Sequence, residues 1–132
     1  HEHEQITKLF AADFCSNEEG RQYIRQAFER GYLVDPHTAT CFKTCRSAEF
    51  KDQVNIIYST AEWTKFASII DNAINANQPD SDQAALQSVS TTAGIEVPGV
   101  ISGLFDKPIA QPDIVEKQAI ESEILKFLET EN

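Results

Sequence analysis

The chain has 132 residues, of which 41% are hydrophobic and 24% are charged, a composition typical of one globular domain that excludes a disordered chain. Its net charge of −10 is uneven, because residues 1–66 carry ten acidic and eight basic side chains whereas residues 67–132 carry eleven and three. The shortage of basic residues argues against a nucleic-acid partner. No apolar run is long enough to predict a membrane-spanning helix, so we expect no membrane partner.

The three cysteines, Cys15, Cys41 and Cys45, are an odd number and form no disulfide framework. This favours a reducing compartment and predicts a cytoplasmic protein. Cys41 and Cys45 would share one face of a helix, but two cysteines without a second pair of ligands make a poor zinc site. We therefore expect the cysteines to pack in the core, and we expect no metal site.

The first predicted elements are two helices. Residues 5–14 have apolar side chains at helical spacing, which predicts a helix there. Ser16 and Glu19 then form a capping box, which predicts a second helix that begins after Ser16. This helix is expected to end near Gly31, because glycine is favoured just beyond a helix terminus.

The middle of the chain contains a third predicted helix, a strand and a fourth helix. Asp35 followed by Pro36 is a strong start signal for a helix that ends near Ser47. Residues 54–58 are β-branched, short and nearly continuously apolar, which predicts a buried parallel strand. An apolar stripe over residues 61–75 predicts the helix that follows.

The last part of the chain is predicted to contain turns and a final helix. A loop is expected near residues 76–82, a weak helix over 83–92 and a turn-rich segment over 94–111. A C-terminal helix is expected over 112–130, opened by a proline. Its inner face would consist of Ile120, Ile124, Phe127 and Leu128.

One strand cannot form a free-standing sheet, because buried parallel strands need neighbours on both sides. We therefore predict an α/β, helix-rich fold: a partial three-layer fragment with one or two parallel strands flanked by helices.

Two motifs of the chain resemble those of threonine synthase. Residues 31–39, Gly-Tyr-Leu-Val-Asp-Pro-His-Thr-Ala, resemble the Asp-Pro-His-Thr-Ala motif of that family. Residues 56–66, Ile-Ile-Tyr-Ser-Thr-Ala-Glu-Trp-Thr-Lys-Phe, resemble its strand and Ser-Thr-Ala-His-Pro-Ala-Lys-Phe motif. The motifs occur in the family's order, and the segments around them are also similar. Two departures are Thr40, where valine is usual, and residues 62–64, where the family has His-Pro-Ala.

Threonine synthase is a fold type II lyase that uses pyridoxal phosphate to convert O-phospho-L-homoserine and water to L-threonine and phosphate. Its Schiff-base lysine and glycine-rich phosphate loop lie far upstream of the two motifs, and this sequence has no such loop. The resemblance therefore implies that residues 1–132 are a single C-terminal fragment or domain of a larger enzyme. We expect the fragment alone to hold no catalytic residue, to bind no cofactor and to be inactive. Its expected partners in the full enzyme are the missing N-terminal region and the substrate O-phospho-L-homoserine.

The resemblance implies that Ser59 and Thr60 bind the cofactor, with the Thr60 hydroxyl facing the pyridine nitrogen. From the residues alone, Thr60 could instead cap the helix that follows it. His37 and Thr38 lie in the first turn of a predicted helix, where the helix dipole favours an anion such as the substrate phosphate. Lys65 is the third residue of this candidate substrate or anion pocket. Each of the three could also be a turn-stabilising or surface residue.

A second hypothesis is a stand-alone acidic α/β interaction module that binds a basic protein through the second half of the chain. A cysteine or histidine hydrolase is less favoured, because His37 is the only histidine beyond residue 3 and no cysteine has a nucleophile's sequence context. A fragment of a larger enzyme would expose apolar surface, so we also expect self-association.

Overall fold

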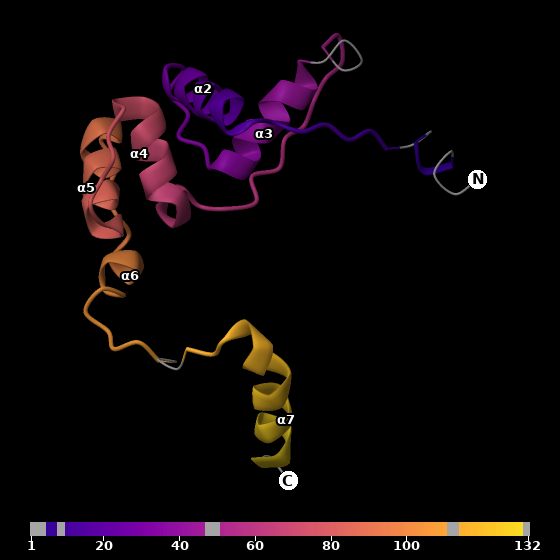
Figure 1. Cartoon of the computed structure of the whole chain (residues 1–132). Coiled ribbons are helices and arrows are strands. Elements are labelled where there is room, and N and C mark those ends of the chain that lie inside the picture. The colour runs from indigo at the N-terminus through magenta and orange to yellow at the C-terminus, as the bar shows by residue number, and fades with distance from the viewer. Residues whose placement is uncertain (1–4, 8–9, 47–50, 111–113, 131–132) are drawn as a thin grey trace.

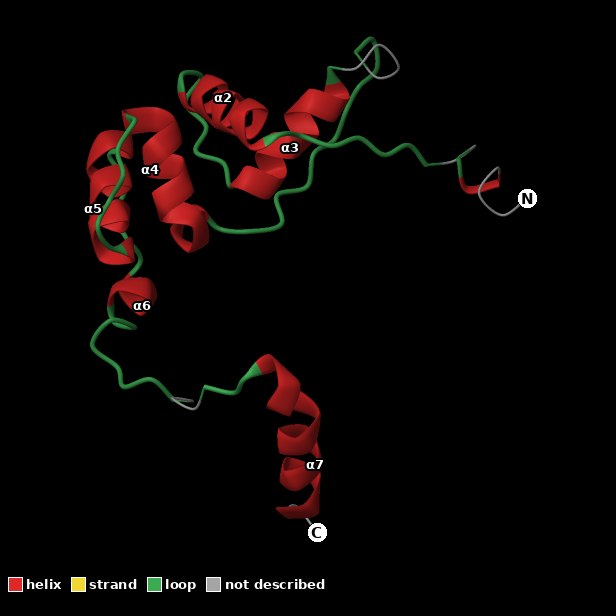
Figure 2. Cartoon of the chain, in the orientation of Figure 1, coloured by secondary structure: helices red, strands yellow, loops and turns green. Residues whose placement is uncertain are grey.

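The computed structural model describes residues 5–7, 10–46, 51–110 and 114–130, and the regular elements in these ranges are helices (Figures 1 and 2). In chain order they are α2 (Asn17–Phe28), α3 (Pro36–Cys45), the 3-10 helix η1 (Trp63–Phe66), α4 (Ala67–Asn75), α5 (Asp82–Ala93), α6 (Gly99–Ser102), the 3-10 helix η2 (Lys117–Ala119) and α7 (Ile120–Thr130). None of these helices is long and apolar enough to cross a membrane.

The predicted α/β fold is wrong, because the described part of the chain contains no strand. The residues predicted as a buried strand, 54–58, lie in a segment without secondary structure. Val54 is 97% exposed, and Ile56 and Tyr58 are each 79% exposed. Their β-branched and aromatic side chains favour extended backbone, but a strand also needs hydrogen bonds to a neighbour, and no described segment provides them.

The capping-box prediction for α2 is confirmed. Ser16 Oγ accepts a hydrogen bond from the Glu19 amide at 3.3 Å, and Glu19 Oε2 accepts one from the Ser16 amide at 2.8 Å. The helix ends at Phe28, and Gly31 follows with a φ of +86°, in the left-handed region that glycine favours.

The helix predicted over residues 5–14 is present only at its start and is wrong for residues 10–14. Residues 5–6 are helical, and the Phe10 amide donates to the Ile6 carbonyl at 2.9 Å. Residues 10–14 have no helical conformation, and residues 8–9 lie outside the described residues. Phe10 and Phe14 are 69% and 78% exposed, so no core contact supports a helix there. Apolar residues at helical spacing do not stabilise a short helix unless they pack against another surface, and residues 10–14 have no such surface among the described residues.

The helices of the second half follow the predicted order with shifted boundaries. The helix predicted over 61–75 begins at Trp63 as η1 and continues as α4. Ser81 caps α5 by accepting a hydrogen bond from the Ala84 amide at 3.1 Å, and α5 ends before Gly94, whose φ is +67°. Within the described residues 94–110, the turn-rich segment contains the one-turn helix α6 and no other regular element.

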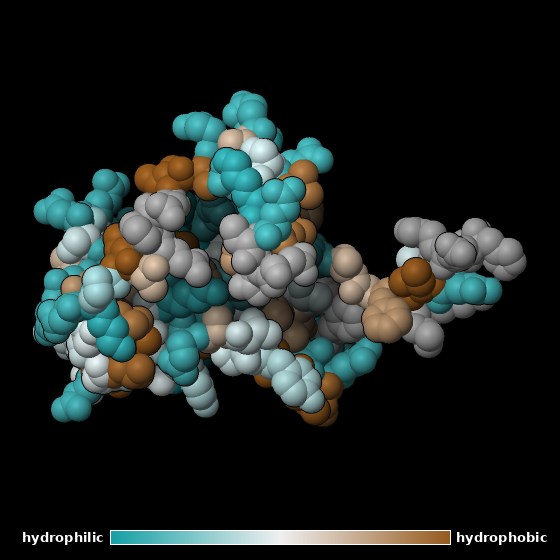
Figure 3. All heavy atoms as spheres, turned by 90° about the horizontal axis from the view of Figure 1, so that it is seen from below, coloured by the Kyte–Doolittle hydropathy of each residue, from teal (hydrophilic) through white to brown (hydrophobic). Residues whose placement is uncertain are grey.

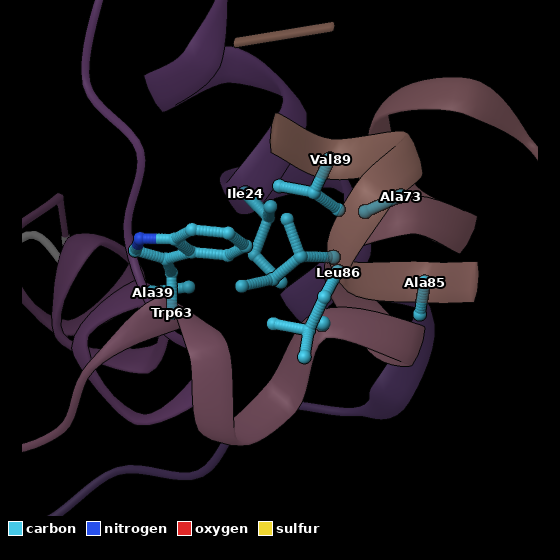
Figure 4. Packing of buried hydrophobic residues seen from close by; sticks show 9 residues of the cluster. Ile24, Ala39, Trp63, Ala73, Ala85, Leu86 and Val89 are labelled. Atoms are coloured by element: carbon cyan, nitrogen blue, oxygen red, sulfur yellow. The ribbon is translucent and has the colours of Figure 1, made fainter. Parts of the chain in front are cut away.

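The core lies between α2, α4 and α5, with Trp63 of η1 and Ala39 of α3 at its edge (Figure 4). Its other buried residues are Ile24, Ala67, Ile70, Ala73, Ala85, Leu86 and Val89. A polar contact also joins two of these helices, because Arg25 Nε in α2 donates to the Ala73 carbonyl in α4 at 2.8 Å.

Helix α7 is present, but its predicted inner face is exposed. It lies apart from helices α2 to α5 (Figure 1). The exposed fractions are 47% for Ile120, 54% for Ile124, 64% for Phe127 and 56% for Leu128. The helix begins at Ile120 after η2, and the proline predicted to open it, Pro112, lies outside the described residues. Apolar side chains are visible between polar ones on the face shown in Figure 3.

Candidate functional site

The turn that begins α3 and the segment before η1 lie side by side. The hydroxyl oxygens of Thr38 and Ser59 are hydrogen-bonded at 3.3 Å. The rings of His37 and Phe66 meet edge to face, with centroids 4.9 Å apart and planes at 60°. The structure therefore brings together residues that are more than twenty positions apart in the sequence.

Asp35 is the residue that organises this site. Its carboxylate is buried, with 1% of the residue exposed. Oδ1 accepts hydrogen bonds from the amides of His37 at 2.9 Å and Thr38 at 3.3 Å, and Oδ2 accepts one from the Thr38 hydroxyl. Burial acts to raise the pKa of Asp35, but the hydrogen bonds from Thr38 and His37 outweigh it and hold that pKa below its usual value.

The hydrogen bonds of Asp35 change what the first turn of α3 can bind. The amides of His37 and Thr38, which a helix N-terminus would offer to an anion, both donate to the Asp35 carboxylate. An anion at this turn would therefore be held by side chains. His37 is suitably placed, because its side chain is 62% exposed and its Nδ1 lies 3.3 Å from Asp35 Oδ1.

Ser59 and Thr60 follow the extended segment and differ in their surroundings. The Ser59 hydroxyl lies 3.3 Å from the Thr38 hydroxyl and 3.4 Å from the Ala61 carbonyl. Because Thr38 donates its proton to Asp35, the single Ser59 proton is shared between the Thr38 oxygen and the Ala61 carbonyl. Thr60 is exposed, and no hydrogen bond joins its side chain to the other described residues. It does not cap the next helix, because the N-cap position of η1 is Glu62 and no side chain caps it. The Thr60 hydroxyl is thus available to a ligand.

Lys65 is connected to this site only through Phe66. Its Nζ lies 5.5 Å from the centre of the Phe66 ring. The same ring contacts His37. Lys65 also lines a separate apolar hollow of about 580 Å³ between η1, α5 and α6. The structure therefore places Lys65 between two regions rather than beside Ser59 and Thr38.

Two features of the structure were missed from the sequence. Asp35 was predicted only as a helix cap, and its bond to the Thr38 hydroxyl was not foreseen. Asp71 of α4 was not singled out, although it is fully buried and Oδ1 accepts hydrogen bonds from Asn75 at 2.7 Å and Ser88 at 2.6 Å. The available signal was its place between Ile70 and Ala73, inside an apolar stripe, where a lone carboxylate must find partners.

The cysteines and the acidic residues supply no metal site in the described ranges, since no group of three or more His, Cys, Asp or Glu side chains could hold an ion. The three cysteines are half-buried thiols. Burial and the nearby Glu19 carboxylate raise the pKa of Cys15, which makes this thiol less reactive.

Comparison with known proteins gives one group of relatives. The chain is 35% identical to threonine synthase-like 1 of Mus musculus over 89 residues, which are 64% of this chain and 12% of that protein. It is 34% identical to the Homo sapiens and Pongo abelii proteins of the same name over 87 residues, again 12% of each relative. The chain is similar to threonine synthase-like 1 proteins over about two thirds of its own length. It covers about one eighth of their length, no family model matches it, and no solved structure does so.

Pyridoxal phosphate, the cofactor that the threonine synthase resemblance implies, fits this site in part. A neutral hydroxyl is a suitable partner for a pyridine nitrogen, and Thr60 presents one at the surface beside the Ser59–Thr38 pair. The sequence has no glycine-rich loop to hold the phosphate. The residues present thus fit the ring nitrogen of the cofactor and no other part of it.

Proposed function

We propose that this chain is the C-terminal region of a threonine synthase-like enzyme that depends on pyridoxal phosphate. The whole enzyme would be a lyase that converts O-phospho-L-homoserine and water to L-threonine and phosphate. The observation that carries the proposal is the 3.3 Å contact between the Thr38 and Ser59 hydroxyls. It joins the two motifs that resemble threonine synthase, and the 35% identity to a threonine synthase-like protein supports the same assignment.

In this proposal each residue of the site has a separate task. Thr60 offers its hydroxyl to the pyridine nitrogen, and because a hydroxyl carries no negative charge it does not hold a proton on that nitrogen. Ser59 and Thr38 fix the backbone next to Thr60, and Asp35 fixes Thr38. Pyridoxal phosphate, when bound, supplies the electron-withdrawing ring that the reaction needs. His37 and Lys65 are the residues available to meet the substrate phosphate.

The test uses the full-length polypeptide that contains this chain. Replacing the hydroxyl, Thr60→Ala, is expected to shift the absorbance maximum of the bound cofactor and to reduce phosphate release from O-phospho-L-homoserine at least tenfold. Thr60→Ser keeps the hydroxyl and is expected to retain most of the activity. Thr91→Ala is the matched control, because Thr91 is exposed on α5 and its hydroxyl bonds only within that helix.

If Thr60→Ala left both the cofactor spectrum and the rate unchanged, the assignment of Thr60 to the ring nitrogen would be wrong. A second measurement addresses the wider proposal. The 132-residue chain, which we expect to be inactive alone, is mixed with a folded N-terminal part of the same enzyme. Restored phosphate release supports an enzyme region, whereas its absence, together with capture of a basic protein, supports the acidic interaction module instead.

A further inference from the structure

The buried carboxylate of Asp71 has one oxygen with hydrogen-bond partners and one without. Oδ1 accepts hydrogen bonds from the Asn75 side chain at 2.7 Å and from the Ser88 hydroxyl at 2.6 Å. Oδ2 is buried as well, and it has no hydrogen-bond partner among the described residues. A proton on Oδ2 would not remove the problem, because the described residues offer it no acceptor either. Since a buried polar atom without a partner is costly, Oδ2 requires a group from outside the described residues.

Asp71 lies on the inner wall of a polar hollow between α4, the loop of residues 76–81 and α5. The hollow has a volume of about 300 Å³, and its lining includes Asn77, Gln78 and Asp80 of the loop. Asp71 is 0% exposed, whereas Gln78 and Asp80 are exposed at the mouth of the hollow. The side chains of Gln78 and Asp80 make no hydrogen bond to other described residues. The hollow therefore presents one buried and two exposed acceptor groups.

The chain around the polar hollow is acidic and supplies no cation of its own. Residues 66–106 contain no lysine, arginine or histidine, and their five acidic residues are Asp71, Asp80, Asp82, Glu96 and Asp106. None of the ion pairs between described residues includes Asp71. Buried charges in proteins are normally paired, because an unpaired one keeps its desolvation cost. The charge around the hollow therefore favours a cationic donor from elsewhere.

An organic cation suits the polar hollow better than a metal ion. Asp71 and Asp80 are the two carboxylates of its lining, and the described residues contain no group of three or more metal-binding side chains. A hard cation such as Ca²⁺ needs roughly six to eight oxygen ligands. A guanidinium group instead carries several N–H donors and is more weakly hydrated than an ammonium, which makes it the cation of choice for buried ion pairs. It can also bond to acceptors at different depths at the same time.

We propose that the polar hollow binds the guanidinium group of an arginine in the N-terminal region of the full-length polypeptide. One N–H group donates to Asp71 Oδ2, and the others donate to Asp80 and Gln78 at the mouth. The choice of an arginine from the same polypeptide rests on the function proposed above, in which this chain is one region of an enzyme about eight times as long. The binding of a guanidinium group itself does not depend on that function.

The site is tested by titrating methylguanidinium chloride into the isotope-labelled 132-residue chain and following the amide signals by NMR. The signals of Asn77, Gln78 and Asp80 are expected to shift with a Kd on the order of 5 mM, which is typical of a ligand with few atoms. Tetramethylammonium chloride, a cation without N–H donors, controls for ionic strength and should leave these signals in place. If methylguanidinium caused no shift, or if both salts caused the same shift, the proposal would be wrong.

Three variants with the same change of charge locate the bound group. Asp71→Asn keeps an acceptor for Asn75 and Ser88 but places an NH₂ group at Oδ2, and it should weaken methylguanidinium binding at least tenfold. Asp80→Asn should weaken it at least threefold. Glu96→Gln, at an exposed position outside the hollow, is the matched control and should leave the Kd unchanged. Should Asp71→Asn not fold, Asp80→Asn carries the test, and an unchanged Kd for it would contradict the proposal.

The source of the guanidinium group is tested with the folded N-terminal part of the enzyme. Calorimetry measures how tightly this part binds the 132-residue chain. Asp71→Asn and Asp80→Asn are expected to weaken that binding, whereas Glu96→Gln is not. Equal binding of all three variants would contradict the assignment to the N-terminal region. Because phosphate release reports the proposed function and the methylguanidinium titration reports the site, failure of one is distinguishable from failure of the other.

Discussion

At the scale of single residues, Asp35 has the largest influence on the candidate site. Its buried carboxylate holds two backbone amides and the Thr38 hydroxyl, and through Thr38 it reaches Ser59. A carboxylate with these partners acts both as a helix cap and as the link between the two motifs. The site therefore depends on a residue that does not itself face a ligand.

Replacing this carboxylate, Asp35→Ala, is expected to lower the free energy of unfolding by about 2 kcal/mol, because a cap is lost and the Thr38 hydroxyl is left without its acceptor. Urea unfolding followed by the fluorescence of Trp63, the single tryptophan, measures this change. Asp35→Asn keeps an acceptor and should cost about half as much. Asp52→Ala, at an exposed position, is the control. A loss below about 0.5 kcal/mol for Asp35→Ala would show that the carboxylate is not a structural centre.

Glu19 makes the free energy of unfolding of the chain depend on pH. Hydrogen bonds from the Ser16 amide, and then from Lys43 and the Ser16 hydroxyl, lower the pKa of Glu19 from 4.5 to about 2. A carboxyl whose pKa is lower in the folded state stabilises that state fully above the unfolded pKa, and this stabilisation is lost as the pH falls towards the folded pKa. The contribution of Glu19 is therefore lost between about pH 4.5 and pH 2.

Glu19→Gln tests this contribution, because the amide cannot titrate. The variant is expected to have a lower melting temperature than the wild type at neutral pH, and the difference should shrink as the pH approaches 2. Thermal unfolding followed by circular dichroism at several pH values gives both curves. The control is Glu29→Gln, at an exposed position just beyond α2, and the difference between its melting temperature and that of the wild type should not change with pH. If the melting temperature of Glu19→Gln followed that of the wild type at a constant offset, the role assigned to Glu19 would be wrong.

At the scale of elements, predictions from the sequence succeed where hydrogen bonds between nearby residues determine the structure. They fail where the structure depends on contacts with distant parts of the chain. The starts of α2 and α3 are set by Ser16 and Asp35, whose side chains bond within three residues. The segment 54–58 has the composition of a strand, but a strand also depends on a neighbour that no local pattern supplies. The apolar face of α7 was predicted from the periodicity of its sequence. The surface that would cover this face was not predicted, because periodicity carries no information about a binding partner.

The junction of α4 and α5 is held by Asp71. Its Oδ1 joins Asn75 at the end of α4 to Ser88 of α5, and Asn77 of the loop lies within 3.5 Å. Asp71→Ala is expected to lower the free energy of unfolding by about 2 kcal/mol, because the half-buried Asn75 and Ser88 lose the acceptor that they share. Urea unfolding measures it, with Asp80→Ala in the exposed loop as the control. If the two substitutions changed the free energy of unfolding equally, the buried carboxylate of Asp71 would not contribute to stability.

At the scale of the whole molecule, the chain exposes far more surface than a compact protein of its mass. Its accessible surface is 10602 Å², whereas a compact chain of this size exposes roughly 7,000 Å². Large exposed apolar side chains occur on segment 54–58 and on α7, among other places. The sequence indicated the two motifs but not that Thr38 and Ser59 would meet. It also led us to expect exposed apolar surface without locating that surface on segment 54–58 or on α7.

The last prediction concerns α7 as a separate unit. A chain that ends at residue 110 should have the same free energy of unfolding as the full chain, within about 0.5 kcal/mol, at low protein concentration. This follows because no α7 side chain belongs to the buried core. If the exposed apolar face of α7 takes part in the expected self-association, only the full chain should gain stability at high concentration. Trp63 fluorescence reports both, because this buried residue lies in the core. A shortened chain that is already less stable when dilute would place α7 against its own helices.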